Sequence, residues 1–130
     1  RVGALWSDLN GGVFERIVLH TNGDGRLAPR TLIADDRPHA VNRVPAAGPG
    51  DPDGFVLCWV IESDGARRIV ARSLSPEAAG AGPSVIISDP RDPFVAAPCM
   101  APVPGGAHVA WVSEFASGGD GSVFYSRLVR

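Results

Sequence analysis

The sequence predicts an all-β protein. Short runs of β-branched and aromatic residues are separated by clusters of glycine, proline, aspartate and asparagine, and no stretch keeps a helical apolar period for long. An apolar run ending in tryptophan also recurs at intervals of about 50 residues, at Trp6, Trp59 and Trp111. A repeat of this length is typical of small sheets that follow one another along the chain. We therefore expect several similar β-modules.

The first module is expected to hold three strands. Its first strand ends the apolar run at Trp6, its second contains Arg16-Ile17-Val18, and its third contains Thr31-Leu32-Ile33. The segment Asn22-Gly23-Asp24-Gly25 joins the second and third strands. It is interpreted as a tight turn and not as a calcium loop, because the alternating ligands and closing glutamate of such a loop are missing.

The next two modules repeat this order. Arg68-Ile69-Val70 follows Trp59 as Arg16-Ile17-Val18 follows Trp6, and Ser84-Val85-Ile86 matches Thr31-Leu32-Ile33. In each of these two modules a proline-led strand comes before the strand that ends in tryptophan. The predicted strands of the whole chain are 2–8, 14–21, 30–35, 39–45, 55–62, 67–74, 83–88, 94–103, 107–114 and 122–129.

The segment from Pro98 to Trp111 resembles the module of bacterial β-propeller repeat proteins. It has a proline-led strand, the turn Pro104-Gly105-Gly106 and an apolar strand ending in tryptophan. The resemblance implies β-propeller blades within one propeller segment, 1–130. One complete four-stranded blade, residues 37–89, is flanked by two incomplete ones, residues 1–36 and 90–130. A lectin-like propeller is one kind that the resemblance admits.

The predicted strands fall into groups of three, four and three. So few blades cannot close a ring, and an open edge of β-rich sequence is an association site. We therefore expect the ring to be closed by oligomerisation of this chain, by another propeller-forming chain, or by sequence outside this chain.

Composition limits the partners. The chain is 45% hydrophobic and 20% charged with a formal charge of -2, which fits a globular protein and predicts no nucleic-acid surface. The longest apolar run, residues 55–61, is too short to cross a bilayer, and the sequence begins without a charged and apolar leader. No membrane partner is expected; an extracellular or secreted location is preferred, although the compartment stays open. Cys58 and Cys99 lie in apolar stretches and are expected to be reduced, buried thiols.

No pattern predicts catalytic residues, a metal or a cofactor. The three histidines lack zinc-ligand spacing, no serine lies in a Gly-x-Ser-x-Gly elbow, and neither cysteine has the setting of a nucleophile. The Asp-box pattern of sialidase-like propellers is also absent. Whether the protein is an enzyme stays open.

One constellation does repeat. A tryptophan is followed by a glutamate and then an arginine, as Trp59, Glu62 and Arg72 and again as Trp111, Glu114 and Arg127. An aromatic face, a carboxylate and a guanidinium are the groups with which fucose-binding and related propeller lectins hold a sugar, so these six residues are the candidate ligand-binding set. For Trp59 the favoured interpretation is a core residue that shares a strand face with other apolar residues, in which case Glu62 and Arg72 form an ion pair at the strand end.

Three loops that carry aspartate offer a second place for binding, at residues 51–53, 89–93 and 117–121. Repeated, near-equivalent positions favour multivalent binding over catalysis, which needs one specialised site. The sequence therefore predicts a non-enzymatic, carbohydrate-binding, lectin-like module. The alternatives are a part of a propeller-type glycoside hydrolase or lyase, with its catalytic carboxylates on other blades, and a structural assembly protein.

Overall fold

The computed structural model is all-β, as predicted, and has no helix in the part of the chain that it describes. It describes residues 2–10, 13–22, 31–33, 41–49, 54–74, 84–113 and 121–129, with side chains for 41–49, 54–74, 84–113 and 121–128. Accordingly, no helix long and apolar enough for a membrane span is found among these residues.

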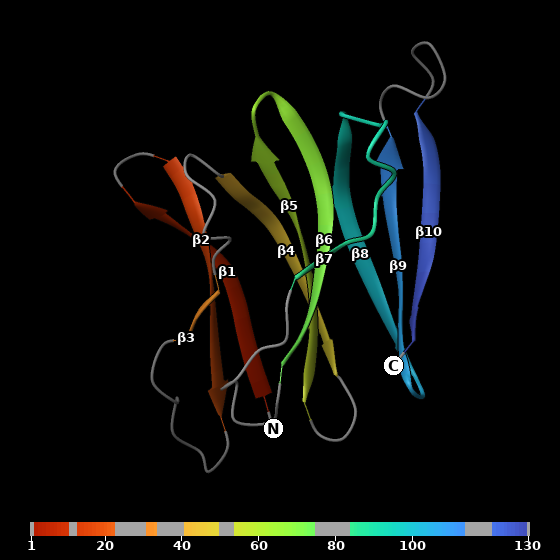
Figure 1. Cartoon of the computed structure of the whole chain (residues 1–130). Helices are drawn as coiled ribbons and strands as arrows, with labels where there is room; N and C mark the ends of the chain where they lie inside the picture. Colours follow the sequence, from red (N-terminus) through yellow and green to blue (C-terminus); the bar gives the residue numbers. More distant parts are fainter. Residues whose placement is uncertain are drawn as a thin grey trace.

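In the described residues, ten strands form three antiparallel sheets, which follow one another along the chain (Figure 1). The first sheet has the order β1-β2-β3, the second β4-β5-β6-β7 and the third β10-β9-β8, which confirms the predicted grouping into three, four and three strands. The strands are β1 (Val2–Asn10), β2 (Val13–Asn22), β3 (Thr31–Ile33), β4 (Val41–Pro49), β5 (Phe55–Ser63), β6 (Ala66–Leu74), β7 (Val85–Ile86), β8 (Val95–Val103), β9 (Gly106–Ser113) and β10 (Ser122–Val129).

Short hairpins set the register in the second and third sheets. Asp64 and Gly65 join β5 to β6 with φ angles of 53° and 73°, the positive values that a two-residue hairpin turn requires. Pro104 and Gly105 join β8 to β9, and Gly105 has a φ of 74°, as expected for a proline-glycine turn. The turn at residues 23–25 lies outside the described residues.

A β-bulge recurs at equivalent places in the second and third sheets. The register of β4 against β5 shifts beside Val44, and the register of β8 against β9 shifts beside Ala97. Both residues have positive φ, 48° and 49°, and both precede a proline. Because the bulge absorbs the proline without ending the strand, β4 continues to Pro49, four residues beyond its predicted end.

The second sheet lies between the other two, and its strand β5 is buried on both faces. Leu57, Trp59 and Ile61 are buried on one face of β5, while Cys58 and Val60 are buried on the other. β4 contacts β1 and β2 of the first sheet, while β4, β5 and β6 contact β8 of the third. The continuous apolar run of β5 is therefore the pattern of a strand sandwiched between two layers.

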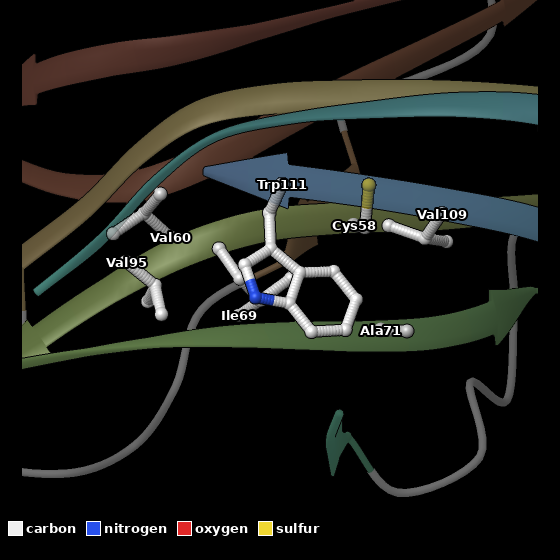
Figure 2. Close-up of a cluster of buried hydrophobic side chains, with 7 residues drawn as sticks. All are labelled: Cys58, Val60, Ile69, Ala71, Val95, Val109 and Trp111. Carbon is white, nitrogen blue, oxygen red and sulfur yellow. The ribbon is translucent and has the colours of Figure 1, made fainter. Parts of the chain in front are cut away.

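A cluster of buried side chains joins the second sheet to the third (Figure 2). The indole of Trp111 extends from β9 over the side chains of β5 and β6. Ala46, Met100 and Leu128 pack against the margin of this cluster. Its members are Cys58, Val60, Ile69, Ala71, Val95, Val109 and Trp111.

One of the two cysteines differs from the expectation of a buried thiol. Both are free, and Cys58 is buried as predicted, but Cys99 is exposed. The bulge at Ala97 resets the alternation of β8, so that Val95 and Met100 pack toward the second sheet and Cys99 lies on the opposite face. Burial raises the pKa of the Cys58 thiol to about 12, with a smaller contribution from the charge of Cys99.

Candidate functional site

Trp59, the first aromatic residue of the predicted sugar site, lies in the interior. Its side chain has an exposed fraction of 0%, and its Nε1 donates a hydrogen bond of 2.7 Å to Oδ1 of the buried Asn42. A buried indole satisfied by a buried amide is the arrangement expected of a core tryptophan. Trp59 therefore offers no open face for a ligand in this structure.

Glu62 and Arg72 do not form a cross-strand pair. Glu62 lies opposite Arg67 and forms ion pairs with Arg67 at 3.4 Å and with Arg43 at 3.6 Å. Arg72 lies opposite Leu57, five residues away along β5, a separation of about 16 Å. The two residues also occupy opposite faces of the sheet. Arg72 shares the face of its register partner Leu57, and Glu62 lies five positions from Leu57, on the other face.

The second predicted set is also divided. Trp111 faces the second sheet, while Arg127 is exposed and lies opposite His108, on the other face of the third sheet. Glu114 lies outside the described residues, as do the loops 51–53 and 117–120. Trp111 and the loop 89–93 are thus the predicted elements that the structure brings to one open place.

That place is a cleft of about 450 Å³ between the second and third sheets. One wall is the segment after β7, and the other is the inner face of β9 and β10. The volume lies within the range of about 300 to 1,000 Å³ that is usual for small-molecule sites. The cleft is lined by Ile87, Asp89, Arg91, Asp92, Trp111, Phe124, Tyr125 and Ser126.

Two aromatic rings form the apolar wall. Trp111 and Phe124 are register partners on neighbouring strands, and their rings are stacked with centroids 6.5 Å apart and planes inclined by 19°. Trp111 is only 6% exposed, whereas Phe124 is 43% exposed. Phe124 therefore presents the open ring, and Trp111 supports it from within the core cluster.

Hydrogen bonds fix the opposite wall to β6. Ile87 N donates to the Ile69 carbonyl at 2.9 Å, and the Ser88 hydroxyl accepts from Ile69 N at 3.0 Å. Further along, Arg67 N donates to the Pro93 carbonyl at 2.9 Å. The loop that carries the polar lining is thus held at both ends by a buried strand of the second sheet.

The polar lining is an ion pair at the mouth of the cleft. The Arg91 guanidinium contacts both carboxylate oxygens of Asp89, with Nη2 to Oδ2 at 2.6 Å and Nε to Oδ1 at 3.0 Å. Arg91 N also donates to Oδ1 of Asp89 at 2.9 Å. These hydrogen bonds lower the pKa of Asp89 to about 2, with the guanidinium as the largest cause. At neutral pH the cleft therefore presents an ionised carboxylate and a guanidinium, paired with each other, beside an aromatic ring.

The sequence analysis does not identify Phe124 and Ser126 as site residues. The register of the last hairpin could have indicated them, because Phe124 lies directly opposite Trp111 and Ser126 opposite Val109. Tyr125 belongs by alternation to the other face, where its ring lies 6.2 Å from that of His108. Within the described part of the chain, no group of histidine, cysteine and acidic side chains is arranged to hold a metal ion.

Comparison with known proteins identifies no relative of this chain. The chain matches no protein-family model, no curated protein and no solved structure.

Proposed function

We propose that the protein is a non-enzymatic carbohydrate-binding module and that its binding site is the cleft between the second and third sheets. The observation that carries the proposal is the juxtaposition of the half-exposed ring of Phe124 with the Asp89–Arg91 ion pair across one open cleft. A sugar ring has an apolar face and a rim of hydroxyls. The aromatic ring suits the first, and the charged pair suits the second by charge-assisted hydrogen bonds.

Binding is favoured over glycoside hydrolysis by the state of Asp89. A hydrolase needs one carboxylic acid that stays protonated near neutral pH, which requires a raised pKa. Arg91 has the opposite effect on Asp89 and keeps its carboxylate ionised. Asp92, the other acid of the cleft, accepts a hydrogen bond from Phe94 N, which closes a short turn within the loop. Asp89 is therefore not placed as a proton donor for a leaving group.

We also propose that the three sheets are blades of a β-propeller, one complete and two incomplete. The proposal is supported by the meander order of each sheet, by the recurring tryptophan and by the bulge shared by β4 and β8. Clefts between neighbouring blades would then recur around a ring. The repetition would give several weak sites that act together on a multivalent glycan.

A glycan array followed by calorimetry with the best sugar tests the proposed site. Phe124→Ala is expected to weaken binding at least tenfold, or about 1.4 kcal/mol, and Arg91→Lys to weaken it in the same direction, because lysine cannot make the two-pronged contact. Arg127→Lys is the matched control, since Arg127 is exposed on the other face of the third sheet. Equal affinity in all variants, or no glycan bound at millimolar concentration, would overturn the proposal.

A further inference from the structure

The outer face of the third sheet, directed away from the second sheet, is uncovered in the described structure and is largely apolar, with Arg127 and His108 at one end. On β10, Val123 and Tyr125 are each 74% exposed. On β8, Cys99 and Ala101 are exposed, and on β9, Ala110 and Val112 are half-buried. We define these six residues as the outer face. A flat apolar surface of this kind, next to the free edge of β10, is a site of association in β-proteins.

The chain already contains the equivalent of this face in a covered state. Trp59 lies opposite Val70 in the second sheet, and Trp111 lies opposite Phe124 in the third, so the registers superimpose. In this alignment Ala110, Val112, Val123 and Tyr125 stand where the second sheet has Cys58, Val60, Ile69 and Ala71. Those four residues of the second sheet form the buried surface onto which Trp111 packs.

The element that would cover the outer face is therefore a sheet carrying a tryptophan at the position of Trp111. The first sheet has that feature. Trp6 lies opposite Val18 in the register of β1 and β2, as Trp111 lies opposite Phe124. Within one chain the first and third sheets lie on opposite sides of the second, so the first sheet cannot reach its own third sheet (Figure 1).

We propose that the outer face of the third sheet binds the first sheet of a second copy of this chain, head to tail. The contact would repeat the internal interface between the second and third sheets, with Trp6 of one copy in the place of Trp111. Such a heterologous contact propagates in one direction and ends only when the copies close a ring. The inference rests on the proposed equivalence of the three sheets, and Tyr125 is the member of the outer face that also lines the cleft.

The first test compares the mass of the full chain and its variants by sedimentation equilibrium. The parent is expected to form an oligomer, and Val123→Glu a folded monomer of 13.5 kDa, because the new carboxylate would be buried without a partner. Val85→Glu is the matched control, since Val85 is also exposed but lies on β7 of the second sheet. A monomeric parent at millimolar concentration, or an oligomer that survives Val123→Glu, would overturn the proposal.

The reactivity of the Cys99 thiol provides a second measurement on the same samples. In the folded Val123→Glu monomer, its thiol should react with an alkylating reagent as an exposed cysteine. In the parent oligomer it should be protected, because Ala46, its equivalent on β4, packs against the internal cluster. Equal reactivity of Cys99 in the oligomer and the folded monomer would mean that another surface makes the contact. Failure of sugar binding with these results intact would remove the sugar site alone.

A mixing experiment tests the head-to-tail direction. Val123→Glu blocks the third sheet, and Trp6→Glu is designed to block the first sheet. Each variant alone should be monomeric, while an equimolar mixture should form a dimer through its one remaining pair of intact faces. If Trp6→Glu does not fold, Val18→Glu replaces it, since Val18 is the register partner of Trp6. A folded first-sheet variant that still self-associates would show that two third sheets meet face to face, and would overturn the proposal.

Discussion

Replacement of Trp59 by alanine is the sharpest test of how the sheets are held together. The indole is fully buried on the face of β5 that it shares with Leu57 and Ile61, and its nitrogen donates to Asn42 at 2.7 Å. The substitution removes a large buried side chain and one hydrogen bond. If Trp59 were instead an open platform for a ligand, the same substitution would leave the fold intact.

The expected loss of stability has two parts. Deleting a buried tryptophan costs about 3 to 5 kcal/mol, through lost transfer free energy and the cavity left behind. Loss of the hydrogen bond to Asn42 costs about 0.5 to 1.5 kcal/mol more. The sum, about 3.5 to 6.5 kcal/mol, is comparable with the whole unfolding free energy of an ordinary domain, about 5 to 15 kcal/mol.

Urea unfolding at one fixed protein concentration measures this loss, since association would otherwise shift the midpoint. Trp59→Phe should fall between the parent and Trp59→Ala, because it keeps an aromatic ring but not the donor. Val85→Ala, at an exposed position, should change stability by no more than about 0.5 kcal/mol. An unchanged midpoint for Trp59→Ala would refute the packing argument.

Three further predictions concern charge and backbone. The Asp89 carboxyl should titrate near 2 by NMR, and Arg91→Ala should return its midpoint toward 3.8. Because the pKa of Asp89 is lower in the folded than in the unfolded state, the stability that this carboxylate contributes is present above pH 3.8 and is lost as the pH falls toward 2. The Cys58 thiol should resist alkylation until the protein unfolds. Since its folded pKa is raised from 9.0 to about 12, stability should fall as the pH rises above 9.0, and a flat pH profile from 9.0 upward in Cys58→Ala is the control. Val44→Gly should stabilise the fold by about 0.5 to 1 kcal/mol. The left-handed conformation costs a valine about 1 to 2 kcal/mol, and glycine avoids this cost but loses more chain entropy on folding. A variant that urea unfolds more easily than the parent would contradict this prediction.

The strands could be predicted because their signals are local. Alternating or continuous apolar runs and the Gly and Pro turns predict the ten strands found in the described residues, and the Trp repeat groups them as the sheets do. The bulges could not be predicted in the same way. Pro45 and Gly48 read as the end of a strand, but the unusual φ of Val44 lets β4 continue, and Gly48 then packs closely against Met100 of the third sheet.

The candidate site depends on contacts between sheets, which no local pattern encodes. Trp111 and the loop 89–93 were each identified from the sequence, but separately. Only the packing of the third sheet on the second brings them to one cleft with Phe124. The repeated Trp, Glu and Arg order had suggested a common site, yet strand alternation places Trp59 and Glu62 on opposite faces of the sheet. Spacing along a strand indicates neighbours only when the faces are counted as well.

Sugar binding beside Trp111, in the cleft between the second and third sheets, is tested most directly by the indole N–H signals in a two-dimensional NMR spectrum. Individual Trp→Phe variants assign the signals, and the best sugar from the array is then titrated into the parent protein. The signal of Trp111 is expected to shift in step with binding, because its ring lies behind Phe124 in the cleft, while the signal of Trp59 stays in place in the core. A shift of the Trp59 signal while the Trp111 signal stays in place would contradict sugar binding in this cleft.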